Sequence, residues 1–320
     1  MFERLQSNRF LVLGRAGMDL YADPPGSRTE EAARFTSALG GSAANIAAGI
    51  VRLGGSASLI TTVSDDAVGR YVIRELARYG VGTSHVRWVA GQSRTSLAVV
   101  ETRLENCQSV IYRNDAADLL LSSVQVADIM MQGHAALIVT GTALAVEPSR
   151  AATLQAMSQA RTAGVPVILD VDYRPYSWVS ADDAAATCRM AAAECDIVIG
   201  NDTEWDVMAG GPGGLALAQS LASGRTAAIY KMGEKGSVSF AGGTRFETPV
   251  YRVVALKPTG AGDAFMAGLV TGLAAGLDLR EAVRRGTAAA AIVVTRVGCA
   301  PASPTAEELS GFMRDSVAPS

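Results

Sequence analysis

Histidine and cysteine are scarce in this sequence of 320 residues. The two histidines and four cysteines are His85, His134, Cys107, Cys188, Cys195 and Cys299. Two separate histidines exclude a histidine-rich metal centre, and the cysteines lack the CxxC spacing of zinc and redox sites. We interpret them as unpaired thiols of a cytoplasmic protein, since disulfides are rare in that compartment. No GxSxG motif supports a Ser-His-Asp triad, so an enzyme with this sequence is expected to use a carboxylate as its base.

Long apolar runs and an excess of one charge are also missing. The longest unbroken apolar run is Ala288–Val294, far short of the roughly 20 residues of a membrane helix. No charged region followed by an apolar stretch opens the chain, so we expect no signal peptide. With 28 Lys+Arg against 31 Asp+Glu, the formal net charge of -3 argues against nucleic-acid binding. A Walker A motif is absent, which excludes a P-loop nucleotide site.

What the sequence does contain is an apolar fraction of 49%, typical of a packed globular protein. Short β-branched runs alternate with longer Ala-rich stretches of helical periodicity. Several expected strands are apolar on both faces: Ala136–Thr140, Val167–Val171 and Ile197–Gly200. This pattern predicts an α/β fold in which helices cover both faces of a mostly parallel sheet.

Two segments interrupt this alternation, Asp19–Leu39 and Arg94–Leu121. Both interleave polar and apolar residues, as half-solvated strands do, and such strands do not suit a buried parallel sheet. We therefore expect a small antiparallel sheet that forms a lid from segments near 15–39 and 94–121. No linker divides the chain, which predicts a single domain over residues 1–320.

The most informative motif is Gly260-Ala261-Gly262-Asp263, which opens an Ala-rich helical stretch. Small residues at a helix start let the main chain approach a ligand, and the free N–H groups together with the helix dipole favour an anion. A carboxylate beside an anion is unfavourable unless it has a chemical task. Asp263 fits a general base for an attacking hydroxyl, and the alternative is that it only caps the helix.

Two further motifs each allow a functional and a structural interpretation. Gly40 and Gly41 precede a helix on which Asn45 offers a donor and an acceptor for sugar hydroxyls; a plain glycine turn is the alternative. Asn201 and Glu204 follow an expected strand, where ligands collect in open α/β sheets, and they suit magnesium or its waters. A helix cap is the alternative for this pair.

In their order and spacing, these motifs resemble those of the ribokinase-like (PfkB) carbohydrate kinases, from Phe10 to about Pro304. The resemblance implies a three-layer αβα core with a β-sheet lid, and transfer of the γ-phosphoryl group of ATP to a sugar hydroxyl. It implies ATP and Mg²⁺ as cofactors, and it leaves open a monovalent cation (K⁺) and a homodimer through the lid. One departure is Pro258, which stands where the family usually has an acidic residue.

The same resemblance implies roles for individual residues. Asp263 would be the general base, and Asn201 and Glu204 would position Mg²⁺ through water. The anion hole for the phosphoryl group would be the main chain of Gly260, Ala261 and Gly262. The residues expected to hold the sugar are Asp19, Gly40, Gly41 and Asn45, and those expected beside the nucleotide are Lys231, Gly233, Gly236 and Thr259.

Two arginines, Arg113 in the expected lid and Arg174 after a core strand, suggest an acidic substrate. A guanidinium group matches a carboxylate or phosphate bidentately, which a neutral sugar does not require. The alternative for each arginine is an ion pair with a neighbouring aspartate: Asp115 or Asp118 for Arg113, and Asp170 or Asp172 for Arg174.

The motifs Tyr-Arg-x-Asp-x-Ala-Asp, Asp-Tyr-Arg-Pro-Tyr-x-Trp and Lys-Pro-x-Gly-Ala-Gly-Asp resemble the branch of the family that serves inositol catabolism. This resemblance implies that the substrate is a sugar acid, 5-dehydro-2-deoxy-D-gluconate, phosphorylated at its 6-hydroxyl. Phosphorylation of 2-dehydro-3-deoxygluconate is a close alternative, followed by that of a neutral sugar such as fructose or ribose. A non-catalytic sugar sensor is a remote alternative.

Overall fold

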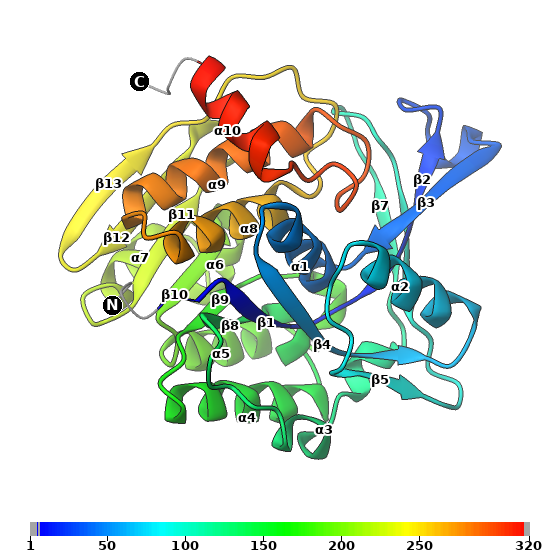
Figure 1. Ribbon diagram of the computed structural model, residues 1–320, viewed down its shortest axis with the longest axis horizontal. Helices are drawn as coiled ribbons and strands as arrows, with labels where there is room; N and C mark the ends of the chain where they lie inside the picture. Colours follow the sequence, from blue (N-terminus) through cyan, green and yellow to red (C-terminus); the bar gives the residue numbers. More distant parts are fainter. Residues whose placement is uncertain (1–4, 6, 317–320) are drawn as a thin grey trace.

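A computed structural model describes residue 5 and residues 7–316 of the protein. A nine-stranded sheet lies between two layers of helices, and a four-stranded sheet stands to one side of it (Figure 1). The expected α/β fold with a mostly parallel sheet and a β-sheet lid is therefore confirmed. No helix in the described part of the chain is long and apolar enough to cross a membrane.

The large sheet has the strand order β13-β12-β11-β10-β9-β8-β1-β4-β5. Neighbouring strands are parallel except in the pairs β11–β12 and β12–β13, which are antiparallel. Its strands are β1 (Arg9–Leu13), β4 (Ser56–Ser64), β5 (Val86–Val89), β8 (Ala136–Thr140), β9 (Val167–Asp170), β10 (Ile197–Asn201), β11 (Ala227–Lys231), β12 (Ser237–Ala241) and β13 (Thr244–Thr248). All five residues of β8 are buried. On β1, Phe10 and Val12 face one apolar cluster, whereas Leu11 and Leu13 face the other.

The helices form two layers, one on each face of this sheet (Figure 1). The first layer consists of α1 (Ser42–Arg52), α2 (Ala67–Arg78), α8 (Ala261–Ala274), α9 (Leu279–Val294) and α10 (Ala306–Asp315). The second consists of α3 (Ser123–Ala127), α4 (Ser149–Thr162), α5 (Ala181–Ala192), α6 (Asp202–Ala209) and α7 (Gly214–Leu221). Several begin at side-chain caps; Asp66, for example, accepts hydrogen bonds from the N–H groups of Val68 and Gly69 at the start of α2.

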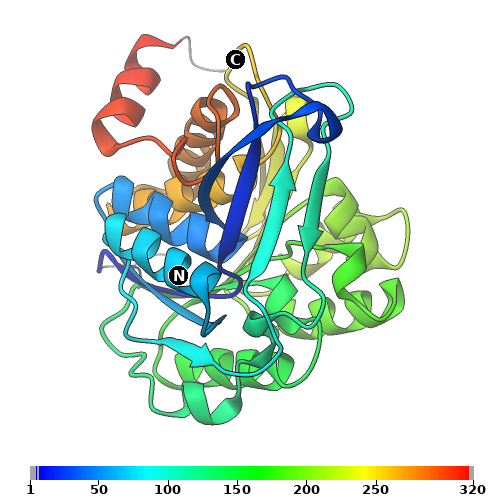
Figure 2. The ribbon, with the colours of Figure 1, turned by 90° about the vertical axis from the view of Figure 1, so that its right-hand side faces the viewer.

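The lid sheet has the strand order β3-β2-β6-β7. Its strands are β2 (Gly17–Asp23), β3 (Arg34–Gly40), β6 (Ser96–Val100) and β7 (Ser109–Tyr112), and they stand side by side in Figure 2. Both expected lid segments contribute to it. The expectation of a wholly antiparallel sheet was wrong in one respect: β2 and β6 are parallel. Each segment forms an antiparallel pair, and the two pairs meet through their first strands.

The strand order reverses between β1 and β8. From β1 the sheet continues through β4 to β5, and from β8 it continues in the opposite direction to β13. In open α/β sheets, ligands bind beyond the carboxyl ends of the strands at such a switch point. The segments that follow β1, β8 and β9 are therefore the place to look for a site.

Candidate active site

Asp263 is the third residue of α8, and no side chain caps this helix. The helix is preceded by Gly260, whose φ of 82° lies in the left-handed region that favours glycine. The first N–H groups of α8 have no partner within the helix, so residues 260–262 present donors that suit an anion. Burial, together with the nearby charge of Asp172, raises the pKa of Asp263 to about 7. Asp263 thus gains or loses a proton close to neutral pH.

Asn45 reaches Asp263 from the first turn of α1. Its Nδ2 donates a hydrogen bond to Oδ2 of Asp263 across 2.9 Å, and its Oδ1 is buried without a partner among the described residues. Both glycines before α1 are required by close packing. A Cβ atom on Gly40 would lie 2.0 Å from Oδ1 of Asp19, and one on Gly41, where φ is 93°, would lie 2.4 Å from the main-chain oxygen of Arg15.

Asp19 comes from the lid strand β2 and completes this group. Tyr21 donates its hydroxyl to Oδ2 of Asp19 across 3.1 Å. Burial raises the pKa of Asp19 to about 6, against the opposing effect of the Arg15 charge. The structure therefore brings Asp19, Gly40, Gly41 and Asn45 together with Asp263, as their joint assignment from the sequence requires.

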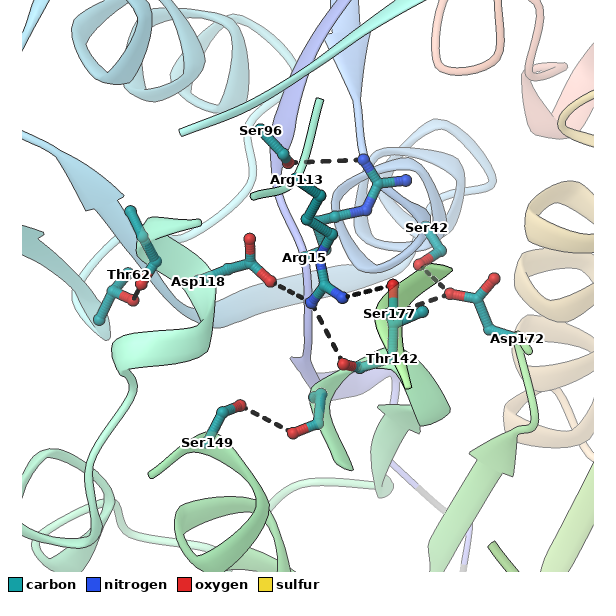
Figure 3. Close-up of polar contacts among 12 residues, drawn as sticks. Arg15, Ser42, Thr62, Ser96, Arg113, Asp118, Thr142, Ser149, Asp172 and Ser177 are labelled. Carbon is teal, nitrogen blue, oxygen red and sulfur yellow. Dashed lines mark hydrogen bonds and ion pairs between the residues drawn. The ribbon is translucent and has the colours of Figure 1, made fainter. Parts of the chain in front are cut away.

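Asp172 links several elements of the site and was not among the residues predicted for it. Its Oδ2 accepts hydrogen bonds from Ser42 Oγ at 2.6 Å and from Thr142 Oγ1 at 3.2 Å (Figure 3). Its Oδ1 lies 2.9 Å from Nη2 of Arg174. Asp172 has a φ of 38°, a left-handed conformation that an aspartate adopts at some cost. This unusual conformation and these partners fix the position of the Asp172 carboxylate within the site.

The guanidinium of Arg174 pairs with Asp172 and lies 3.9 Å from Oε1 of Glu204. This pairing agrees with the ion-pair alternative from the sequence, although 41% of the side chain remains exposed. The charge of Asp172 raises the pKa of Arg174. Arg174 therefore stays charged beside the carboxylates that follow β9 and β10.

Arg113, by contrast, does not present a free guanidinium. Its Nη2 pairs with Asp118 and also donates to the main-chain oxygen of Thr142, while Nη1 donates to Oγ of Ser177 (Figure 3). The side chain is only 2% exposed. These contacts match the alternative in which Arg113 pairs with Asp118, and both side chains of the pair are buried.

Asn201 and Glu204 form a reciprocal cap at the start of α6. Glu204 Oε2 accepts a hydrogen bond from the N–H of Asn201, and Asn201 Oδ1 accepts one from the N–H of Glu204. The capping alternative is thus observed. Within the described residues, no three His, Cys, Asp or Glu side chains are grouped closely enough to hold a metal ion by themselves.

Asp170 lies at the end of β9 and was not predicted as a site residue. Burial raises the pKa values of both Asp170, to about 8, and Glu204, and the negative charges around them add to the effect. Lys231, at the end of β11, opposes both shifts. These carboxyl groups lack enough positive charge nearby, which is the electrostatic condition that favours a cation.

The four residues expected beside the nucleotide lie in two places. Lys231 Nζ would be 3.4 Å from a Cβ atom on Gly262, which places the lysine against the start of α8. Thr259 precedes Gly260, the residue before that helix, and its hydroxyl is buried without a partner in the described structure. Gly233 and Gly236 bound the turn between β11 and β12. A side chain on Gly236 would meet the main chain of Thr248, so packing alone explains this glycine.

Two further basic residues of the site were missed by the sequence analysis. Arg15 lies two residues after the end of β1 and is 8% exposed. Lys257 is fully buried, and its ammonium donates to the main-chain oxygens of Thr259 and Val293. Their positions in the sequence could have indicated them, because each is a basic residue next to a glycine motif and to an apolar strand or run.

Comparison with known proteins gives a family. The sequence model of the pfkB family carbohydrate kinases matches residues 7–306. A protein of Photobacterium profundum named 5-dehydro-2-deoxygluconokinase is 42% identical, over 95% of this chain and 94% of its own length. One of the same name from Bacillus subtilis is 36% identical, over 93% of this chain and 94% of its own length.

Solved structures agree with this family. A fructokinase double mutant from Vibrio cholerae, with fructose, ADP and a potassium ion bound, superposes with a TM-score of 0.86 at 26% identity. The alignment covers 96% of this chain and 98% of that one. An aminoimidazole riboside kinase from Salmonella enterica has a TM-score of 0.81 at 25% identity, over 96% of this chain and 99% of its own.

Proposed function

The chain belongs to the pfkB family of carbohydrate kinases, and from this we propose that it transfers the γ-phosphoryl group of ATP to the 6-hydroxyl of 5-dehydro-2-deoxy-D-gluconate. It is an ATP-dependent sugar kinase. The relatives that align over almost their whole length carry the name of a sugar-acid kinase, which favours this substrate over 2-dehydro-3-deoxygluconate, fructose and ribose.

The observation that carries the proposal is the position of Asp263 at the N-terminus of α8. A base must accept the proton of the attacking hydroxyl while negative charge is stabilised on the phosphoryl oxygens. Asp263, with a pKa raised to about 7, meets the first requirement. The second would be met by the N–H groups at Gly260, Ala261 and Gly262, because they precede the hydrogen-bonded part of the helix.

Asp19 and Asn45 would orient the sugar for this transfer. Asn45 keeps a buried acceptor, Oδ1, that a hydroxyl of the substrate can satisfy. The backbone at Gly40 and Gly41 allows the lid carboxylate of Asp19 to approach the start of α1. Because Asp19 belongs to the lid, its contact with the sugar would couple binding to lid closure and the exclusion of water.

For the two arginines predicted to bind substrate, the contacts suggest different roles. The guanidinium of Arg113 is held by Asp118, so we assign it to fixing the end of β7 against the core. Arg174 is half-exposed beside Asp172 and Glu204. The positive charge of Arg174 would lie near the substrate or the transferred phosphoryl group, and it would stabilise negative charge on either one.

A divalent cation fits the carboxylates at the ends of β9 and β10. Asp170 and Glu204 have raised pKa values, and in the described structure the Asp170 side chain has no hydrogen-bond or ion-pair partner. We propose that these two residues, with Asn201, hold Mg²⁺ through its water ligands, since Mg²⁺ usually retains several waters. When bound, the ion would neutralise charge on the phosphate oxygens of ATP. Thr259, Lys231, Gly233 and Gly236 remain the proposed neighbours of the nucleotide.

A monovalent cation fits less well beside the anion hole. The main-chain oxygens of Thr259 and Val293 are the type of ligand that K⁺ prefers, but the ammonium of Lys257 already occupies them. We therefore propose that this position needs no added K⁺.

The remaining proposals concern the whole molecule. We expect one domain over residues 1–320 that works in the cytoplasm, where ATP is available. A homodimer through the lid is supported by the edge strand β7, on which Val110 and Tyr112 are exposed. Sedimentation velocity would distinguish the dimer from a monomer.

The activity is tested by a coupled ADP-release assay with Mg-ATP. The panel contains 5-dehydro-2-deoxy-D-gluconate, 2-dehydro-3-deoxygluconate, fructose and ribose, with the Asp263→Asn variant as control. The highest kcat/KM is expected for the first acid. A higher value for any other member would refute the proposed substrate, and equal ADP release by the variant would refute the role of Asp263. ADP release on none of the four would refute the proposed substrate and would favour another sugar acid first and a non-catalytic sensor second.

A further inference from the structure

Arg15 stands at the switch point of the sheet. It follows β1, which ends at Leu13, and precedes the lid strand β2, which begins at Gly17. Strands β4 and β8 flank β1, and the chain passes from the core into the lid at this point. Arg15 therefore lies where ligands bind in open α/β sheets and where the lid meets the core.

The guanidinium of Arg15 has little to hold it in the described structure. Its one hydrogen bond runs from Nη1 to Oγ of Ser96 at 3.5 Å, and no ion pair is formed with a described carboxylate (Figure 3). The other two arginines of the site differ, because Arg113 pairs with Asp118 and Arg174 with Asp172. A nearly buried guanidinium without a carboxylate partner is costly, unless a ligand supplies one.

Two donor atoms of Arg15, Nε and Nη2, are unpaired among the described residues but not enclosed. In Arg113, by comparison, Nε is enclosed without a partner. Two adjacent donors on one edge of a guanidinium that have no partner and are not enclosed are suited to a bidentate carboxylate.

The positive charge of Arg15 affects the two aspartates of the site, Asp19 and Asp263. It lowers the pKa of Asp19 and that of Asp263, in both cases against the raising effect of burial. Arg15 is therefore close to both the base and the lid carboxylate. An anionic substrate must enter between these aspartates, and their negative charges disfavour it unless a cation compensates.

The other basic groups near the site are already used. The ammonium of Lys257 is buried against two main-chain oxygens, and that of Lys231 lies beside the start of α8. From this geometry we propose that Arg15 binds the carboxylate of the sugar-acid substrate and sets the preference of the enzyme for an acid. This inference rests on the proposed function and deepens it, because it assigns a subsite to the part of the substrate that does not react.

The test uses steady-state kinetics on the full chain with Arg15→Gln and Arg15→Lys. For Arg15→Gln, we expect the KM for 5-dehydro-2-deoxy-D-gluconate to rise about 10- to 100-fold, the loss typical of a charged hydrogen-bonded pair. The KM for ATP and kcat at saturating acid should stay within about threefold of the wild type. Arg15→Lys keeps the charge but loses the paired donors, so its KM for the acid should be intermediate.

The control is Arg34→Gln, which removes the same charge from an exposed lid arginine and should leave all three parameters unchanged. Circular dichroism and thermal unfolding establish that each variant is folded. If Arg15→Gln is unfolded, the Arg15→Lys variant tests the proposal instead. A KM of Arg15→Lys for the acid equal to that of the wild type would overturn the proposal.

A KM for the acid that stays within about threefold in Arg15→Gln would also overturn it. An equal loss for acid and ATP would do the same, because it indicates a structural role. The proposed function fails separately, if the wild-type enzyme does not phosphorylate the acid at all.

Discussion

The side-chain amide of Asn45 donates a hydrogen bond to Oδ2 of Asp263 across 2.9 Å, and this bond joins the first turns of α1 and α8. The bond favours the ionised carboxylate, whereas burial favours the protonated form. Their balance leaves the pKa of Asp263 near neutrality, which suits a group that accepts a proton and releases it again. The packing of α1 against α8 thus sets the pKa of the Asp263 carboxyl group.

Replacement of Asp263 by asparagine removes the base but keeps the size of the side chain. We expect kcat to fall at least about 100-fold, the lower range for loss of a general base, with little change in the KM for the sugar. A coupled assay measures both. Asp278→Asn, at the exposed cap of α9, is the matched control and should retain full activity. An unchanged kcat in Asp263→Asn would exclude this residue as the base.

The pH dependence of the reaction should follow the same carboxyl group. Because a base acts only when deprotonated, kcat/KM is expected to fall about tenfold for each pH unit below the pKa of Asp263, which is about 7 in the free enzyme. The profile is measured from pH 5 to 9 in buffers of constant ionic strength. A flat profile between pH 5 and 7 would contradict a raised pKa.

The sequence was sufficient to predict the layers and most of the residues gathered around Asp263. Strongly apolar strands such as Ala136–Thr140 and Val167–Asp170 have a clear pattern because both of their faces are buried. Three short elements that are not buried on both faces were not predicted: β5 and β13 are four and five residues long and half-exposed, and α3 has five residues. Their patterns span too few residues to indicate a period.

The roles of several charged residues stayed open in the sequence, because only the fold decides which of the possible partners each residue meets. Arg113 is neutralised by Asp118, only five residues away, and the sequence left this pairing open. Asp172 gains its partners Ser42 and Thr142 only through the fold. The surroundings of Arg15 are also visible only in the fold: within the described chain its guanidinium has one hydrogen bond, to Ser96, and no carboxylate partner.

The stability of the ligand-free protein should decrease as pH rises. Burial raises the pKa values of Asp19, Asp170 and Asp263 to about 6, 8 and 7, above the 3.8 of an unperturbed aspartate. Between pH 4 and 8 the folded state therefore holds protons that the unfolded state has released, and its stability is lost as pH rises. We expect the free energy of unfolding to fall by at least about 2 kcal/mol from pH 5 to 8.

Urea unfolding at the two pH values measures this difference. Asp170→Asn should reduce the dependence on pH, because one of the three raised groups no longer titrates. Added MgCl₂ should stabilise the wild type more at pH 8 than at pH 5, since the ion binds ionised carboxylates. Greater stability at pH 8 in the absence of ligand would show that these groups are ionised at little cost.

The buried pair of Arg113 and Asp118 predicts a non-additive pair of substitutions. Arg113→Ala leaves Asp118 buried and uncompensated, so it should cost about 3–5 kcal/mol of stability. Asp118→Ala leaves the arginine in the same state. The double variant should cost less than the sum of the two, because neither charge then remains unpaired. Urea unfolding of the three variants measures the coupling, and strict additivity would contradict the pairing.

Lys257 holds the turn that leads into α8. Its ammonium bridges the main-chain oxygen of Thr259 to that of Val293 near the end of α9, where the helix dipole favours a positive charge. Burial lowers the pKa of this lysine, but the two oxygens and the nearby Asp263 favour the charged form. Lys257→Met removes the bridge, and we expect kcat/KM for ATP to fall at least about tenfold as the start of α8 loosens.

A smaller side chain at this position provides the decisive comparison. Lys257→Ala leaves the oxygens of Thr259 and Val293 without a donor and opens space between them, so K⁺ or NH₄⁺ should restore part of the lost activity, whereas tetramethylammonium should not. The wild type should be equally active with any of these cations, because its own ammonium fills the position. Arg34→Met, which removes a positive charge from an exposed residue of the lid strand β3, controls for loss of charge alone. Activation of the wild type by K⁺ would show that the position of Lys257 does not replace the ion.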